Sequence, residues 1–285
     1  MCATCGCVAD DAPIDASALG DHSHDHSHDH RHDHSHGHLH DHPHDHPHDH
    51  PHDHSHDHPH DHSHDGQTLR ELTLQTAILA KNDRIAERVR RHFRQQNVLA
   101  LNLVSSPGAG KTTLLERMIG DLRNERTILV VEGDQATSAD ADRIERAGAR
   151  AVQINTGTGC HLDAAMVEGA VRALEPTQDA LVLIENVGNL VCPALFDLGE
   201  HAKVVVASVT EGEDKPLKYP HMFRASSLVL LNKIDLLPHL SFDVARFVAN
   251  AKLVHPHLEV LAVSALTGAG LEAWYAWLRS RDAGA

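Results

Sequence analysis

From residue 98 onward, short apolar runs alternate with longer stretches in which apolar and polar residues mix. Most of the runs are apolar throughout, as expected for strands that helices cover on both faces. The seven runs are residues 98–104, 127–133, 150–155, 180–186, 203–209, 227–233 and 259–265. The stretches between them are long enough for crossover helices, for example at 112–124, 138–148, 163–175 and 242–253. The pattern predicts an α/β fold with a mostly parallel, doubly wound sheet, whose ligands lie beyond the carboxyl ends of the strands.

The segment before the first run has a helical pattern. Apolar residues recur at helical spacing through residues 68–96, and they are Leu69, Leu72, Ile78, Leu79, Ile85, Val89 and Phe93. Asn82 and Asp83 interrupt this pattern and predict a break in the helix. We assign residues 67–285 to one domain with an N-terminal helical segment, because about 220 residues suit a single well-buried core.

Residues 21–66 have a different composition. Every even-numbered position from His22 to His64 is a histidine, interleaved with Asp, Ser and Pro. Prolines and the lack of sizeable apolar side chains other than Leu39 predict a disordered segment. Neutral imidazoles and carboxylates are ligands that nickel, zinc and copper ions prefer, so the tract predicts many weak metal sites. A solubilising acidic linker or an engineered tag are the alternatives, although a tag is normally uninterrupted histidine.

The formal net charge of −15 belongs mostly to this tract, because residues 21–65 hold eleven Asp against Arg31 alone. The remainder shows no basic stripe for nucleic acid. No apolar run approaches the roughly 18 residues of a membrane span, and the first twenty residues do not resemble a secretory signal. Five cysteines do not suit a disulfide framework in a chain of this length. These features predict a cytoplasmic protein that binds neither nucleic acid nor membrane.

The first apolar run leads into a glycine-rich loop, Ser105 to Thr113, and then into a helical stretch. Glycines let backbone N–H groups surround phosphates, and the start of a helix adds a favourable field. A serine, Ser105, stands where the common phosphate-loop pattern has its first glycine. The predicted nucleotide contacts here are Ser106, Gly108, Ala109, Gly110, Lys111, Thr112 and Thr113, with Lys111 reaching the β- and γ-phosphates.

A second motif, Asn232-Lys233-Ile234-Asp235, ends a later apolar run and predicts the base. The Asp235 carboxylate can accept from N1–H and the exocyclic amine of guanine, a donor pair that adenine lacks. Lys233 would pack over the base, and Asn232 would brace the loop. After the last run, Ser264-Ala265-Leu266 would supply a backbone N–H to guanine O6. The combination favours GTP over ATP.

Two acidic residues at strand ends are candidates for Mg²⁺ and the attacking water. Asp134 follows the second run and Glu185 ends the fourth. Together with the Thr112 hydroxyl they form the predicted magnesium set, and with Lys111 the predicted catalytic set. Their alternative roles are helix caps or turns. Because no arginine is obviously placed as a finger, we expect slow intrinsic GTP hydrolysis.

The cysteines form two groups. Cys2, Cys5 and Cys7 lie in the head, residues 1–20, where three thiolates around Gly6 can close on Ni²⁺ or zinc; a flexible, redox-prone head is the alternative. Cys160, His161 and Cys192 lie in loops at the nucleotide end of the sheet. They predict a zinc or nickel site with an open fourth position, natural where two subunits meet; inert, buried cysteines are the alternative.

The head, the tract and the motifs SSPGAGKTT, EGDQ, NTGTGCHLD, ENVGNLVCP, NKID and SALTG together resemble the HypB family of hydrogenase nickel-incorporation GTPases over essentially the whole chain. The resemblance implies a SIMIBI-class G domain that dimerises with GTP, nickel at Cys2, Cys5 and Cys7, and zinc or nickel at Cys160, His161 and Cys192. It also implies GTP-dependent nickel delivery, with a HypA-type metallochaperone and the precursor of the [NiFe]-hydrogenase large subunit as partners.

Two alternatives remain open. Urease accessory GTPases resemble this G domain, but their metal motif is Cys-Pro-His, whereas here Cys160-His161 pairs with a distant Cys192. A nickel or zinc storage protein is the second alternative, and it would hold many ions per chain in the tract.

Overall fold

The computed structural model describes residues 64–134, 139–157 and 159–281. Apart from His64 and Asp65, these residues belong to one compact unit. The predicted head and nearly all of the histidine tract lie outside the described residues. No helix within the described ranges combines the length and the apolar character that crossing a membrane requires.

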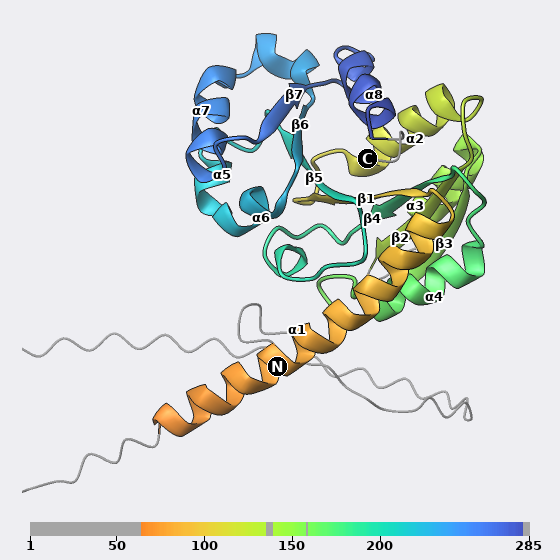
Figure 1. Cartoon of the computed structure of the whole chain (residues 1–285). Coiled ribbons are helices and arrows are strands. Elements are labelled where there is room, and N and C mark those ends of the chain that lie inside the picture. The colour runs from red at the N-terminus through yellow and green to blue at the C-terminus, as the bar shows by residue number, and fades with distance from the viewer. Residues whose placement is uncertain (1–63, 135–138, 158, 282–285) are drawn as a thin grey trace, which may run out of the picture. The chain divides into compact units, whose positions relative to one another are not determined.

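The unit is built on a seven-stranded sheet in the order β3-β2-β4-β1-β5-β6-β7 (Figure 1). Every pair of neighbouring strands is parallel, which confirms the predicted α/β class. The strands are β1 (Leu99–Ser105), β2 (Ile128–Asp134), β3 (Arg150–Asn155), β4 (Leu181–Glu185), β5 (Ala202–Ser208), β6 (Leu228–Asn232) and β7 (Glu259–Ala262). Because β1 lies between β4 and β5, the strand order changes direction at β1. The loops that follow β1, β4 and β5 therefore meet at the carboxyl ends of these strands.

Each predicted crossover segment forms a helix. These four are α2 (Lys111–Leu122), α3 (Ala139–Ala147), α4 (Ala164–Leu174) and α7 (Val244–Val254). The structure adds elements that the pattern analysis did not name: α5 (Lys215–Lys218), α6 (Pro220–Ala225), α8 (Leu271–Arg279) and the 3₁₀ turns η1 (Cys192–Ala194) and η2 (Ile234–His239).

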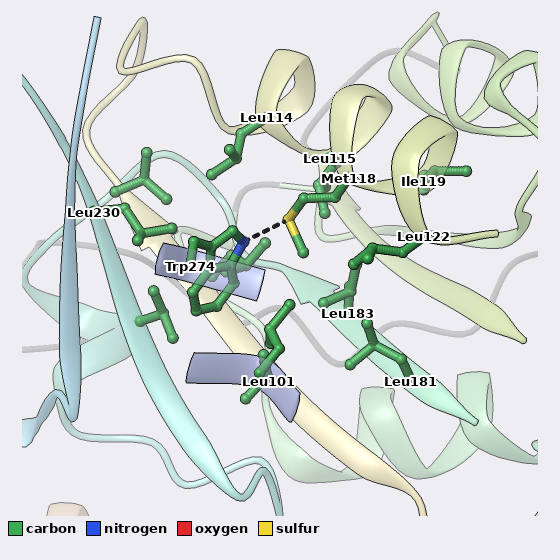
Figure 2. Close-up of a cluster of buried hydrophobic side chains, with 14 of the residues drawn as sticks. Leu101, Leu114, Leu115, Met118, Ile119, Leu122, Leu181, Leu183, Leu230 and Trp274 are labelled. Atoms are coloured by element: carbon green, nitrogen blue, oxygen red, sulfur yellow. Dashed lines mark hydrogen bonds between the residues drawn. The ribbon is translucent and has the colours of Figure 1, made fainter. Parts of the chain in front are cut away.

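Helices cover both faces of the sheet. On one face, α2, α3 and α8 share a core cluster with the strands, where the Trp274 indole N–H points at the Met118 sulfur, 3.2 Å away (Figure 2). On the other face, α1 (His64–Gln95) and α4 share a second cluster that includes Phe93. Strand residues such as Leu99 and Ala100 alternate between the two clusters, which explains why the runs are apolar throughout.

The predicted break at Asn82 and Asp83 is wrong, because α1 runs uninterrupted from His64 to Gln95. Asn82 is buried, and its side chain bonds to distant backbone groups instead of its own helix. It donates to the Asp197 carbonyl at 2.8 Å and accepts from the Ala164 N–H at 2.9 Å. Tertiary partners thus remove the local competition that makes asparagine a poor helix residue.

Candidate functional site

The loop between β1 and α2 has the backbone of a phosphate cradle. Gly108 and Gly110 have φ of +77° and +96°, which side chains rarely adopt. A Cβ on Gly110 would also lie 2.7 Å from the Asn232 amide nitrogen. Glycine at this position is therefore required both by the turn and by the close approach of the guanine loop.

Lys111 and Thr112, at the start of α2, both face Glu185. The Lys111 ammonium donates to the Ser105 hydroxyl at 2.9 Å and lies 3.7 Å from a Glu185 oxygen. The Thr112 hydroxyl donates to the same oxygen at 3.0 Å. Ser105, where the common pattern has glycine, thus accepts a hydrogen bond from the lysine.

Glu132 is a buried acid that the sequence analysis missed. Burial and the neighbouring Glu185 carboxylate raise the pKa of Glu132 to about 9. Burial also raises the pKa of Glu185, against the opposing effect of the Lys111 ammonium. A charged residue inside the otherwise apolar strand β2 was the signal that could have identified it.

These acids fit a magnesium ion. One oxygen of Glu132 and one of Glu185 are buried without a hydrogen-bond partner in the part of the chain that the structure describes. Hard oxygen donors beside the Thr112 hydroxyl are the ligands that Mg²⁺ takes. Asp134 ends β2, beside this group, but its side chain lies outside the described residues.

A cavity of about 550 Å³ adjoins the phosphate loop and includes Lys111, Glu132 and Glu185 in its wall. Arg143 also lines it, which the sequence analysis did not foresee. Its guanidinium is bound to Glu116 at 2.6 Å and to Asp140 at 3.0 Å, so it is held by two carboxylates.

The guanine loop after β6 is tied to the phosphate loop. Asn232 donates to the Ala109 carbonyl at 3.0 Å and accepts from the Ala265 N–H at 3.0 Å. The Lys233 ammonium donates to the Gly108 carbonyl at 2.7 Å. Asn232 therefore connects the phosphate loop, the guanine loop and the loop after β7. The sequence analysis assigned each of these loops to the same nucleotide.

Asp235 and the triplet after β7 complete this region. The Ser264 hydroxyl donates to an Asp235 carboxylate oxygen. The Ala265 N–H is donated to Asn232, and the next residue of the triplet, Leu266, is 75% exposed.

Lys215, at the start of α5, is a third residue that the sequence analysis missed. It is buried, pairs with Glu211 at 2.8 Å and donates to the hydroxyl of Ser106 in the phosphate loop. No local sequence pattern could have identified Lys215, because only the fold brings the loop after β5 to the loop after β1.

The structure brings Cys160, His161 and Cys192 together. One ligand atom from each lies within 4.8 Å of the others. Cys160 and His161 come from the loop after β3, and Cys192 begins η1 after β4. The adjacent pair serves one cluster because the loop turns sharply, which places the Cys160 sulfur 3.6 Å from the His161 Nδ1.

The cluster suits a soft or borderline cation. Two thiols and an imidazole are ligands that zinc and nickel ions accept. Burial lowers the pKa of His161, which favours the neutral imidazole, whose unprotonated ring nitrogen can bind a metal. The His161 ring packs on Phe196 with centroids 4.0 Å apart, which fixes its plane. Cys2, Cys5, Cys7 and the tract from His22 to His62 lie outside the described residues.

Comparison with known proteins decides the family. Residues 99–262 match the model of the CobW/HypB/UreG nucleotide-binding domain. The chain is 62% identical over 209 residues to the hydrogenase maturation factor HypB of Rhizobium leguminosarum bv. viciae, a match covering 73% of this chain and 70% of that protein. It is 54% identical over 212 residues to HypB of Escherichia coli K12, with 74% and 73% covered. The chain belongs to the HypB family.

Solved HypB structures share its fold. HypB from Archaeoglobus fulgidus is 41% identical with a TM-score of 0.67, over 71% of this chain and 99% of that one. HypB from Helicobacter pylori, solved in complex with nickel, is 38% identical with a TM-score of 0.66, over 71% and 95%. The predicted resemblance to the HypB hydrogenase maturation factors is therefore confirmed.

Proposed function

We propose that this HypB-family protein is a GTP-hydrolysing nickel metallochaperone, which binds Ni²⁺ and delivers it during maturation of [NiFe]-hydrogenase. The observation that carries the proposal is the shared location of two sites. Strand β4 ends in Glu185, beside the phosphate loop, and continues to Cys192 of the metal cluster. Cargo and nucleotide thus bind to the same short segment.

GTP binds, in this proposal, between the phosphate loop and the guanine loop. Gly108 to Thr113 surround the phosphates, while Asp235 accepts from guanine and Lys233 covers the base. Thr112 would hold Mg²⁺ together with either Glu185 or Asp134, and the ion would neutralise charge that develops on the phosphates. Lys111 stabilises the same charge, and the acid that does not hold the ion orients the attacking water.

Hydrolysis by a single chain is slow, because among the described residues no unpaired arginine lines the cavity. Arg143 lines the cavity, but Glu116 and Asp140 hold its guanidinium. A second copy of the chain, assembling with GTP, would supply the missing acceleration. The further partners are a HypA-type metallochaperone and the precursor of the hydrogenase large subunit.

Nickel is cargo, and three groups of ligands receive it. Cys2, Cys5 and Cys7 form a selective site, the histidine tract forms a weak reservoir, and Cys160, His161 and Cys192 form the site next to the nucleotide. Three donors at this last site leave a fourth position for a ligand from a partner, through which the ion can be passed on. Zinc is the alternative occupant.

Nickel titration with and without GTP tests the proposal, comparing the wild type with a Cys2/Cys5/Cys7→Ser variant. We expect the variant to lose a tight site of low stoichiometry while weak binding to the tract persists. Lys111→Ala should abolish nickel transfer to the hydrogenase precursor without changing the number of ions bound.

The tract also favours a second candidate function, nickel or zinc storage. A storage protein would keep its function after Lys111→Ala and would lose it on deletion of residues 21–65. The metallochaperone proposal requires the opposite dependence, so the pair of variants separates the two.

A further inference from the structure

Asn102 is the one polar residue inside strand β1 before its last residue, in the run LALNLVS. Its side chain is fully buried and hydrogen-bonded on both sides. It donates to the Glu200 carboxylate at 3.1 Å and accepts from the Asn186 amide at 3.3 Å. A buried amide costs free energy unless it is satisfied, so its place in the strand calls for a reason beyond packing.

On one side, this chain of bonds reaches the first half of the metal cluster. The side-chain oxygen Oδ1 of Asn186 accepts from the Leu162 N–H at 3.2 Å and from the Val187 N–H at 3.0 Å. Leu162 directly follows His161. Asn186 therefore holds the loop that carries Cys160 and His161 against the end of β4.

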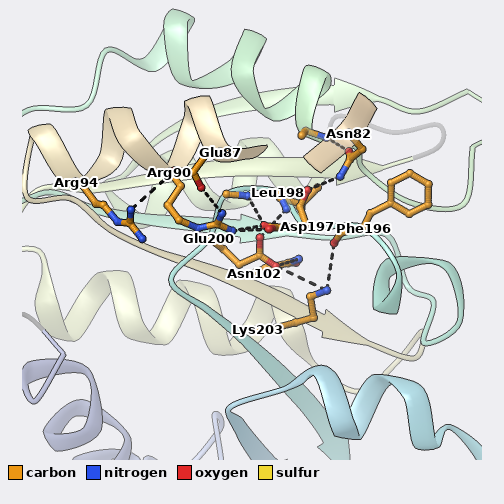
Figure 3. Close-up of polar contacts among 12 residues, drawn as sticks. Asn82, Glu87, Arg90, Arg94, Asn102, Phe196, Asp197, Leu198, Glu200 and Lys203 are labelled. Atoms are coloured by element: carbon orange, nitrogen blue, oxygen red, sulfur yellow. Dashed lines mark hydrogen bonds and ion pairs between the residues drawn. The ribbon is translucent and has the colours of Figure 1, made fainter. Parts of the chain in front are cut away.

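On the other side, the chain reaches the second half. Glu200 accepts from the Leu198 N–H at 2.7 Å and lies 3.8 Å from the buried Lys203 ammonium. Lys203 donates to the carbonyl of Pro193 at 2.8 Å. It also donates to the carbonyl of Phe196 at 3.2 Å (Figure 3). Pro193 follows Cys192, and the Phe196 ring packs on His161.

We call Asn186, Asn102, Glu200 and Lys203 the polar relay. Its two ends hold the two loops that supply the three metal ligands, and its centre lies in the strand that leads to the phosphate loop. Asn186 also directly follows Glu185, which accepts the Thr112 hydroxyl. In the proposed function, Thr112 and Glu185 would bind Mg²⁺ and nucleotide. This would replace the hydrogen bond between them, next to Asn186 in the chain.

We infer that Asn102 and Asn186 are positioning residues of the metal cluster, and that the polar relay transmits the state of the nucleotide site to the metal ligands. The inference rests on the proposed function, since it requires that both sites are used. It differs from a direct link such as Asn189, which donates to the Cys160 carbonyl at 3.3 Å and bypasses the relay.

The test uses the full chain with Cys2, Cys5 and Cys7 changed to Ser, which leaves Cys160 and Cys192 as its thiols. The absorption band of Ni²⁺–thiolate bonds then reports the cluster alone, whatever the histidines bind. Chelator competition gives the Ni²⁺ affinity with GDP and with a non-hydrolysable GTP analogue. We expect the two affinities to differ by at least about fivefold, the lower end of ordinary coupling between sites.

Asn102→Ala and Asn186→Ala should each reduce this ratio to within about twofold of unity, while guanine-nucleotide affinity is retained. Asn189→Ala is the matched control: it should lower Ni²⁺ affinity equally in both nucleotide states and keep the ratio. If Asn102→Ala does not fold, Lys203→Met cuts the relay at another link and should have the same effect.

The inference is overturned if the ratio of the two Ni²⁺ affinities persists in both Asn102→Ala and Asn186→Ala. It is also overturned if Asn189→Ala abolishes this ratio as fully as they do. A ratio of one in the Cys2/Cys5/Cys7→Ser chain without further changes also overturns the inference. Nickel transfer and GTP hydrolysis then still decide the proposed function. Absence of the thiolate band in that background overturns the relay together with the proposed use of the cluster.

Discussion

The phosphate loop and the metal cluster lie at the same end of the sheet but are built differently. The phosphate loop is one continuous segment, residues 105–113, and its shape comes mainly from backbone conformation at Gly108 and Gly110. The metal cluster joins loops more than thirty residues apart in sequence, and buried polar side chains hold them in place. A site made of backbone is specified locally, whereas a site made of side chains depends on the whole fold.

The two sites also differ in charge. Around the phosphate loop, Lys111, Glu132 and Glu185 are close together in a buried setting, and the pKa values of both acids are raised. At the cluster, burial lowers the pKa of His161 and leaves its ring available to a metal. At one site the Lys111 ammonium can neutralise phosphate, and at the other the lowered pKa of His161 reduces competition between protons and a metal cation.

The largest expected effect comes from a change at the nucleotide site that leaves the metal cluster intact. Lys111→Ala should lower the rate of GTP hydrolysis by about 100-fold or more, because the ammonium that stabilises the transferred phosphate is lost. The Ni²⁺–thiolate band of the cluster should remain. Phosphate release and absorption spectra measure the two outcomes, with the exposed Lys252→Ala as control. Loss of the band in Lys111→Ala would show that the sites are not built independently.

The reverse change tests the cluster. In the chain with Cys2, Cys5 and Cys7 changed to Ser, Cys192→Ser should lower the Ni²⁺ affinity of the cluster by more than about 100-fold, since losing even an outer partner of a metal ligand typically costs about 10- to 100-fold. GDP affinity, measured by titration calorimetry, should change less than about twofold, because no phosphate or guanine contact is touched. His239→Ala, an exposed histidine, is the control. Equal loss of nickel and nucleotide binding would contradict the separation.

A smaller effect tests the backbone origin of the phosphate loop. Gly110→Ala should lower the free energy of unfolding by about 2 kcal/mol or more, through strain at positive φ and the contact with Asn232. Gly120→Ala is the matched control inside α2, where a Cβ meets no atom within 4 Å, and it should stabilise by about 0.5–1 kcal/mol. Urea unfolding of both variants is the measurement. A neutral Gly110→Ala would show that the loop tolerates side chains.

The last effect concerns the charge of the nucleotide site. The pKa of Glu132 is about 9 in the folded chain against 4.5 as its ordinary value. Between these values the folded chain keeps a proton that the unfolded chain has lost. The stability that Glu132 contributes is therefore complete below pH 4.5 and falls as pH rises towards 9, by at most about 1.4 kcal/mol per unit.

Glu132→Gln removes this dependence, so the variant should gain stability relative to the wild type as pH rises from 6 to 9. Urea unfolding without nucleotide or metal measures it, and Glu272→Gln on the exposed face of α8 should track the wild type. A constant difference between Glu132→Gln and wild type across this range would contradict a protonated Glu132.

Much of the fold was predictable because its signals are local. Apolar runs near 98–104 and 180–186 became β1 and β4, since a strand covered on both faces needs apolar residues on both. The prediction failed at Asn82, where the pattern indicated a break and tertiary hydrogen bonds to Asp197 and Ala164 stabilise a continuous helix. Helix propensity contributes little free energy per residue, and the two hydrogen bonds of a buried amide outweigh it.

The site divides in the same way. The sequence by itself determined the phosphate loop, the guanine motif and the identity of the cysteines and histidine that could hold a metal, because motif chemistry depends on neighbours along the chain. Only the tertiary structure decided that Cys192 meets Cys160 and His161, that Lys215 reaches Ser106, and that Asn102 connects the two ligand loops. Such contacts join residues far apart in the chain, and their geometry exists only once the strands have taken their order in the sheet.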